Sequence, residues 1–172
     1  LRAARVLWSR IVETFGGDEQ ARKMNIHART SAFTKTVYDP YVNMLRTTTE
    51  AFSGIVGGVE SLQVGTFDEA VRFADDFSRR IARNTQILLQ NECNLLQPVD
   101  PAGGSWYIET LTNQIAEKTW QLLQAVEGDG GLVKVVQRGI PQKAIDEVLA
   151  RRFSKLALRS DRAVDRKSTR LN

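Results

Sequence analysis

The 172-residue sequence predicts an α/β fold built on a parallel sheet. Short segments with strand character begin near residues 24, 59 and 95, and a helical pattern follows each of them. The strand–helix repeat is about 35 residues, close to the ~31 residues per unit of a (β/α)₈ barrel. Helices between successive strands act as crossovers, so they favour parallel pairing.

Three such units cannot close a barrel by themselves. They fit either a small open α/β sheet or the C-terminal part of a (β/α)₈ barrel, namely its last two to three βα units. No further strand is expected after residue 105, where the helical patterns continue. This helical extension favours the barrel portion. From the residues alone both folds stay open. If the barrel portion is correct, it covers residues 1–104, and the helical extension covers residues 105–164.

The N-terminal third shows a helix, a strand and a second helix. Apolar residues at helical spacing predict a helix over 3–15, which two glycines end. A strand is expected over 23–29. Asp39 as N-cap and Pro40 at the first helical position predict the start of the second helix, which Gly57-Gly58 ends. Its expected buried stripe consists of Tyr41, Met44, Leu45, Thr48, Phe52 and Ile55.

A second unit follows in the same order. A strand is expected over 59–64, and the Thr66-x-x-Glu69 spacing predicts a capping box that opens a helix reaching Glu92. A weaker third strand is expected over 95–99, before a loop over 100–105 that is rich in turn residues. Further helices are expected over 108–128, over 132–138 and from Pro141 onward.

Composition excludes several functional classes. The net charge of +4 and the pI near 9.5 arise partly from a basic tail, 165–172, that resembles translated adapter sequence. The remainder has no basic stripe with interleaved aromatics, which argues against nucleic-acid binding. No apolar run approaches the roughly 18 residues that span a bilayer, so no membrane partner is expected. A lone cysteine, Cys93, suits a reducing compartment such as the cytoplasm.

Ligands of parallel α/β folds bind at the C-terminal ends of the strands, and this rule selects two sets of residues. The first set is His27, Arg29, Thr30 and Ser31, in which the cation Arg29 suits a phosphate or carboxylate group of a substrate. A structural alternative is a salt bridge from Arg29 and a hydrogen bond from His27 to the backbone. One histidine and one cysteine cannot form a zinc site, and no residue is selected as catalytic.

The second set is Gly65 and Glu69. Gly65 permits close approach of a ligand to the backbone, and Glu69 can accept a hydrogen bond from a ligand hydroxyl group. The alternative is that Glu69 only closes the capping box at the start of the helix.

Several longer motifs occur in order along the chain. They are His27-x-x-Thr30-Ser31, Asp39-Pro40-Tyr41-x-Asn43, Arg46-Thr47-Thr48-x-Glu50-Ala51, Phe67-Asp68-Glu69-Ala70, Ser78-x-Arg80-Ile81-Ala82-Arg83 and Asp100-Pro101-x-Gly103-Gly104-Ser105. Together they resemble the methylmalonyl-CoA mutase family of adenosylcobalamin-dependent acyl-CoA mutases. The resemblance implies a barrel threaded by the CoA ester and a separate cobalamin domain that lies outside this sequence.

The resemblance also implies a role for individual positions. His27 corresponds to a position that lines the substrate channel, and Glu69 to one that holds the adenosyl group. Catalytic members have Gln at the position of Arg29 and Asn at the position of Gly65. Loss of the Asn with retention of Glu69 fits the capping role of Glu69 better than a cofactor-binding one.

These departures resemble the small, non-catalytic subunit of the heterodimeric mutase. That resemblance implies a large catalytic subunit as partner, which carries adenosylcobalamin and interconverts (R)-methylmalonyl-CoA and succinyl-CoA. This chain then supplies scaffold and interface, and the isolated fragment is inactive. Two alternatives stay open. One is a fragment of a catalytic chain whose His27, Arg29 and Glu69 contact CoA ester or deoxyadenosine, and the other is a stand-alone α/β binding module.

Overall fold

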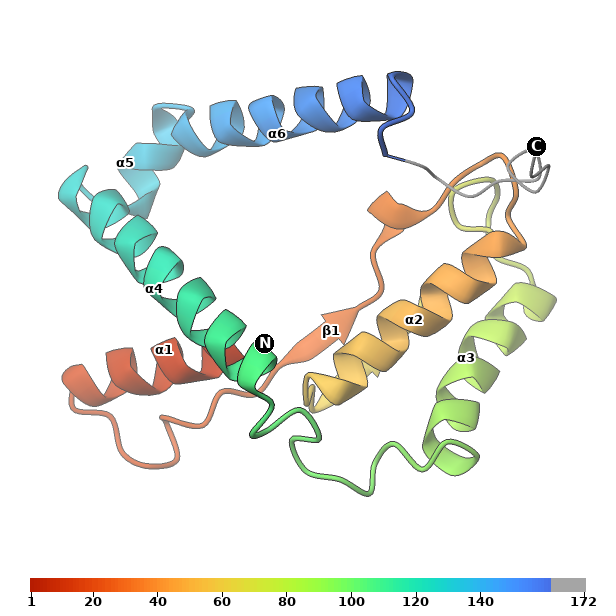
Figure 1. Cartoon of the computed structure of the whole chain (residues 1–172), viewed down its shortest axis with the longest axis horizontal. Coiled ribbons are helices and arrows are strands. Elements are labelled where there is room, and N and C mark those ends of the chain that lie inside the picture. Colours follow the sequence, from red (N-terminus) through yellow and green to blue (C-terminus); the bar gives the residue numbers. More distant parts are fainter. Residues whose placement is uncertain (162–172) are drawn as a thin grey trace. The chain divides into compact units, whose positions relative to one another are not determined.

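The computed structural model describes residues 1–161, and the expected adapter-like tail at 165–172 lies outside them. Two compact units follow one another in the chain, Leu1–Asn113 and the residues from Gln114 onward. The first unit is a helix-rich α/β structure with a small parallel sheet, as the sequence predicts (Figure 1). No helix in the described part of the chain combines the length and apolar character required to cross a bilayer.

The sheet consists of β1 (His27–Arg29) and β2 (Ser61–Gln63), paired in parallel with Arg29 opposite Gln63. Both strands are shorter than the sequence predicts, although backbone hydrogen bonds extend the pairing at each end. Glu60 N–H donates to the Ile26 carbonyl at 3.1 Å, and Thr30 N–H donates to the Gln63 carbonyl at 3.0 Å.

Side chains alternate across the sheet as the strand geometry requires. On one face His27, Arg29, Ser61 and Gln63 are exposed. On the other face Leu62 packs against the buried core of the unit. That core consists of Ala51, Val64, Ala82 and Leu89, with Ile55, Leu62 and Leu95 packed against it.

Three helices accompany the sheet. Helix α1 (Arg2–Thr14) precedes β1 and ends before Gly16, as predicted. Helix α2 (Val42–Val56) contacts β2 and α3 (Asp76–Asn91), and a 3₁₀ turn, η1 (Ala32–Thr34), lies between β1 and α2 (Figure 1). The carboxyl ends of both strands therefore open into loops that lead to the N-termini of α2 and α3.

The buried face of α2 differs from the predicted apolar stripe. Asn43, Thr47 and Ala51 are the buried residues, whereas Tyr41 and Leu45 are 69% and 68% exposed. The physical reason is that small and hydrogen-bonded side chains allow α2 to approach the sheet and its loops closely. The helix also begins at Val42 rather than at Pro40, and Asp39 Oδ1 accepts from Tyr41 N–H at 3.2 Å in the turn before it.

The start of α3 corrects a second expectation. Thr66-x-x-Glu69 does not cap a helix, because residues 67–71 form a turn in which Val71 N–H donates to the Asp68 carbonyl at 2.8 Å. The capping box is instead formed by Asp75 and Ser78. Ser78 N–H donates to Asp75 Oδ1 at 2.8 Å, and Asp75 N–H donates to Ser78 Oγ at 3.0 Å.

The third strand expected over 95–99 does not form. Asn94 and Asp100, which flank it, adopt left-handed backbone conformations with φ of 52° and 48°. Gln97 N–H donates to the Asn94 carbonyl at 3.2 Å, and Pro98 has no N–H to give to a ladder. The segment therefore turns, and Leu95 reaches the core from a loop.

The chain continues through α4 (Trp106–Gly128), which begins in the first unit and ends in the second. The second unit also contains α5 (Leu132–Gln137) and α6 (Ile140–Ala157), which pack together and bury Val135. All three helices agree with the predicted ranges. The predicted boundary between barrel and extension at 104/105 remains a prediction.

The corrected start of α3 leads to a stability test on the full chain. Asp75→Ala removes an N-cap acceptor and should lower the free energy of unfolding by about 1 kcal/mol. Thr66→Ala is the matched control, because it removes the cap that the sequence predicts. It should change the free energy of unfolding by less than about 0.5 kcal/mol. Urea denaturation followed by circular dichroism measures both. A larger loss for Thr66→Ala than for Asp75→Ala would contradict the observed start of the helix.

Candidate functional site

The candidate site lies where β1 and β2 end. Parallel pairing places the residues that follow both strands at the same edge, and Arg29 and Glu69 meet there across the two loops. Arg29 Nη2 donates to Glu69 Oε2 at 3.1 Å. The Glu69 side chain is 15% exposed and the Arg29 side chain 55%. The structure therefore joins the two sets of residues that the sequence selects separately.

Gly65 leaves free the space that the Glu69 carboxylate occupies in this contact. A Cβ atom at this position would lie 2.8 Å from Glu69 Oε2 and 2.9 Å from Oε1, closer than real side chains approach. The Glu69 carboxylate therefore occupies the space that a side chain at position 65 would need. Because Glu69 belongs to a turn rather than to a helix, the predicted capping role of Glu69 is wrong.

The other members of the first set have structural partners. His27 Nδ1 lies 2.7 Å from Ser61 Oγ on the neighbouring strand, not against a backbone group. Thr30 is 4% exposed, and its Oγ1 accepts from Gly65 N–H at 2.8 Å. Ser31 Oγ accepts from Phe33 N–H at 3.1 Å and caps the η1 turn. Arg29 thus makes the salt bridge considered as an alternative, and Thr30 holds the two loops together.

Cavities lie on both sides of the strand ends. One, of 470 Å³, is bounded by Arg29, Gln63, Gly65 and Glu69 and by arginines of the α3 side, Arg72, Arg79 and Arg83. Arg72 Nε donates to Asp68 Oδ2 at 2.8 Å, so part of this positive charge is already compensated. A second cavity, of 330 Å³, borders Thr30, Ser31 and Glu50. No cluster of three or more metal-ligating side chains occurs within residues 1–161.

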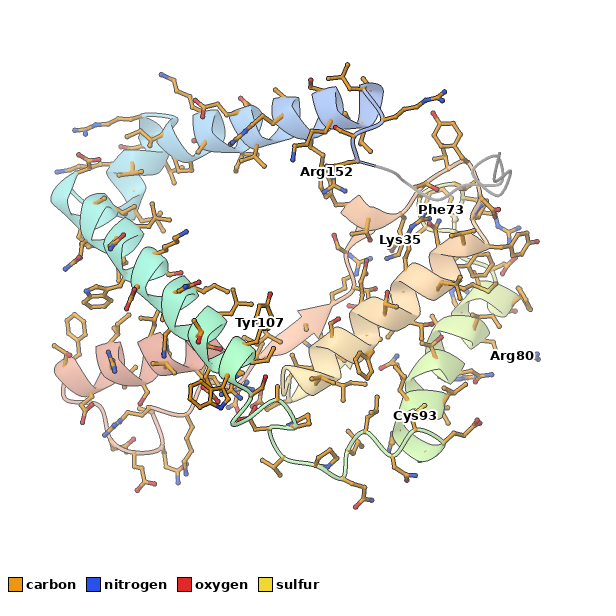
Figure 2. All side chains as sticks on the ribbon, in the orientation of Figure 1. Lys35, Phe73, Arg80, Cys93, Tyr107 and Arg152 are labelled. Carbon is orange, nitrogen blue, oxygen red and sulfur yellow. The ribbon has the colours of Figure 1, made fainter. Side chains whose placement is uncertain are left out.

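A buried ion pair supports the loop after β1. The Lys35 side chain, labelled in Figure 2, is fully buried, and its Nζ donates to Glu50 Oε2 at 2.9 Å and to the Ser31 carbonyl at 2.9 Å. Glu50 also accepts hydrogen bonds from Ser31 N–H at 2.9 Å and from the Thr34 hydroxyl. Burial disfavours the charged form, but the Thr34, Lys35 and Ser31 hydrogen bonds outweigh it and lower the pKa of Glu50.

Sequence reasoning missed Lys35, Glu50 and Asn43 as parts of the site. The available signal was the spacing of Asn43, Thr47, Glu50 and Ala51, which share one face of α2. The prediction instead placed apolar residues such as Tyr41 and Leu45 on the buried face of α2. It assigned burial by hydrophobicity and did not consider hydrogen-bonding capacity.

The geometry defines a parallel βαβ unit with a polar site at its strand ends. Comparisons with known proteins then identify the family: the family model described as methylmalonyl-CoA mutase matches residues 1–168. The chain is 46% identical, over 88% of its length, to methylmalonyl-CoA mutase of Rhizobium meliloti (strain 1021). The chain belongs to the methylmalonyl-CoA mutase family.

Subunits of both kinds occur among the relatives. Identity is 44% over 93% of the chain to the methylmalonyl-CoA mutase small subunit of Porphyromonas gingivalis, and 41% over 88% to the large subunit of the same organism. The chain spans 22% of the Rhizobium protein and 26% of the small subunit, about a quarter of the length of such relatives.

The lowered pKa of Glu50 predicts how stability depends on pH. A carboxyl whose pKa is depressed in the folded state contributes stability above its unfolded pKa of about 4.5, and that contribution is lost as pH falls through the folded pKa. Stability should therefore drop below about pH 4.5 more steeply in the wild-type chain than in Glu50→Gln. Urea midpoints at several pH values measure this. The exposed Glu19→Gln control should keep the wild-type profile, and an equal effect of both changes would contradict the assignment to Glu50.

Proposed function

We propose that this chain is part of the small, non-catalytic subunit of a heterodimeric methylmalonyl-CoA mutase. A large catalytic subunit would interconvert (R)-methylmalonyl-CoA and succinyl-CoA with adenosylcobalamin, and this chain would supply scaffold and subunit interface. In this proposal residues 1–104 are the C-terminal portion of a (β/α)₈ barrel, 105–164 form a helical extension, and the enzyme acts in the cytoplasm. The parallel β1–β2 pair with its crossover helix α2 is consistent with one unit of such a barrel.

The observation that carries the proposal is the Arg29–Glu69 ion pair over Gly65. Two oppositely charged groups that are paired with each other offer less to a ligand, because a ligand must first compete with an existing charged hydrogen bond. By the family resemblance, catalytic chains have Gln and Asn at the positions of Arg29 and Gly65. A neutral Gln could not neutralise Glu69, and any side chain at position 65 would displace the carboxylate from its observed place.

The described residues do not fit the adenosyl group well. Glu69, which would face that group, is paired with Arg29, and Gly65 presents no side chain. We therefore assign the cofactor to the partner subunit and derive no step of the reaction from residues of this chain. The roles of His27, Arg29, Thr30 and Ser31 toward the acyl-CoA substrate, and of Gly65 and Glu69 toward the cofactor, are then structural rather than ligand-binding.

One observation favours a second candidate function, a fragment of a catalytic chain. Glu69 Oε1 is buried and has no hydrogen-bond partner among the described residues, so an acceptor remains beside the 470 Å³ cavity. In that case His27, Arg29 and Glu69 would contact the CoA ester or deoxyadenosine. Overall identity does not separate the two candidates, because relatives of both subunit types are similarly close to this chain.

Mutation of the Arg29–Glu69 ion pair in the complete, assembled enzyme distinguishes the non-catalytic subunit from the catalytic chain. If the chain is non-catalytic, Arg29→Ala and Glu69→Gln should leave kcat and KM within about twofold of the wild type, since no ligand contacts these side chains. If the chain is catalytic, loss of a positioned polar contact should reduce kcat/KM by about 100-fold or more.

The control variant is Arg80→Ala. Arg80 projects from α3 on the side away from α2 and does not line the cavity (Figure 2). It should behave like the wild type under both candidates. The rest of the gene offers an independent check: a Tyr-His-Met-Gln-Glu-Ala-Gly motif upstream together with a cobalt-ligating histidine domain downstream would rule out the small subunit.

A further inference from the structure

The Asn43 side chain is fully buried at the N-terminal end of α2 and uses every hydrogen-bonding position of its amide. Asn43 Nδ2 donates to the Thr36 carbonyl and to the Phe67 carbonyl, both at 2.9 Å. Asn43 Oδ1 accepts from Thr36 N–H at 3.1 Å and from Arg46 Nη1 at 2.8 Å. An asparagine amide offers two donors and two acceptor positions, so this one is saturated.

The partners of this amide belong to different loops. Thr36 lies in the loop after β1, and Phe67 lies in the turn after β2. Asn43 therefore connects the two loops that deliver Arg29 and Glu69 to the candidate site. We propose that Asn43 is a positioning residue, whose buried amide holds the turn after β2 so that Glu69 lies over Gly65 and meets Arg29.

Other contacts also hold the turn, and the Asn43 amide adds hydrogen bonds from α2 to both loops. The Phe67 ring stacks on Tyr41 at 5.7 Å and contacts Phe77 edge-to-face at 6.2 Å. Glu69 N–H donates to the Thr66 carbonyl at 3.3 Å within the same turn. Thr30 fixes Gly65 at the strand end, but nothing in that contact orients the residues after Phe67.

Two substitutions of Asn43 weaken its hydrogen bonds to the two loops in different ways. Asn43→Asp keeps an acceptor for Thr36 N–H and Arg46 but loses both donors, so the part-buried Thr36 carbonyl and the buried Phe67 carbonyl both lose this hydrogen bond. Asn43→Ser shortens the side chain and breaks the reach to Phe67. In both variants the turn is free to shift, and Glu69 leaves its place beside Arg29.

The test is nuclear magnetic resonance of the isotope-labelled full chain, with the guanidinium resonances of Arg29 as the readout. Glu69→Gln defines the position of these resonances when the ion pair is broken. Asn43→Asp and Asn43→Ser should move them at least halfway toward that position, while far-UV circular dichroism shows that the helices remain. A purely structural role would not move a side-chain signal on another element while the fold is retained.

Ser78→Ala is the matched control. It also removes the hydrogen bonds of a fully buried polar side chain, because Ser78 Oγ accepts from Asp75 N–H and donates to the Asp75 carbonyl at the start of α3, but Ser78 does not join the two loops. It should leave the Arg29 resonances in place. Unmoved resonances in both Asn43 variants, equal movement in Ser78→Ala, or loss of folding in both Asn43 variants while Ser78→Ala stays folded would each overturn the positioning role.

This inference takes the Arg29–Glu69 contact as the centre of the site, as the proposed function does. The readout depends only on geometry, whereas the kinetic comparison of the Arg29 and Glu69 variants depends on subunit type. A negative result for the positioning role of Asn43 therefore does not contradict the proposed function, and a negative kinetic result does not contradict the positioning role.

Discussion

The parallel pairing of β1 and β2 is the constraint on which the rest of the first unit depends. It aligns Arg29 with Gln63, so the loops leaving both strands begin at one edge of the sheet. Arg29 and Glu69 are distant in sequence, and this register is what places them close enough to form an ion pair. The pairing is short, and three groups reinforce it from outside the ladder: the Thr30 hydroxyl, the Asn43 amide and the Glu60 carboxylate, which accepts from Ile26 N–H at 2.6 Å.

Helix α2 supports the site with a polar rather than an apolar face. Asn43 reaches the loops of both strands, and Glu50 holds the loop after β1 through Lys35 and Ser31. Buried polar groups are costly unless every hydrogen bond is made, so such a face tolerates little displacement. The consequence for function is a pair of strand-end loops held in one arrangement, whichever subunit type the chain represents.

The Arg29–Glu69 ion pair is the central contact of the candidate site. Here a cation from β1 and a carboxylate from the turn after β2 are directed at each other, across a glycine that leaves room for them. This arrangement holds together the loops after β1 and β2.

The sequence by itself determined the α/β class and the ranges of α1 and α4–α6, and it predicted the sheet edge of the candidate site, because apolar periodicity and the strand-end rule are local or topological. The end of α2 at Gly57-Gly58 and the residue ranges of α4–α6 could be predicted without tertiary information. Only the tertiary structure decided that Thr66-x-x-Glu69 is a turn, that 95–99 is not a strand and that α2 buries Asn43 instead of Tyr41. The structural reason differs from case to case. Phe67 is held by Asn43 and Tyr41, left-handed Asn94 and Asp100 turn the chain, and the partners of Asn43 come from distant loops.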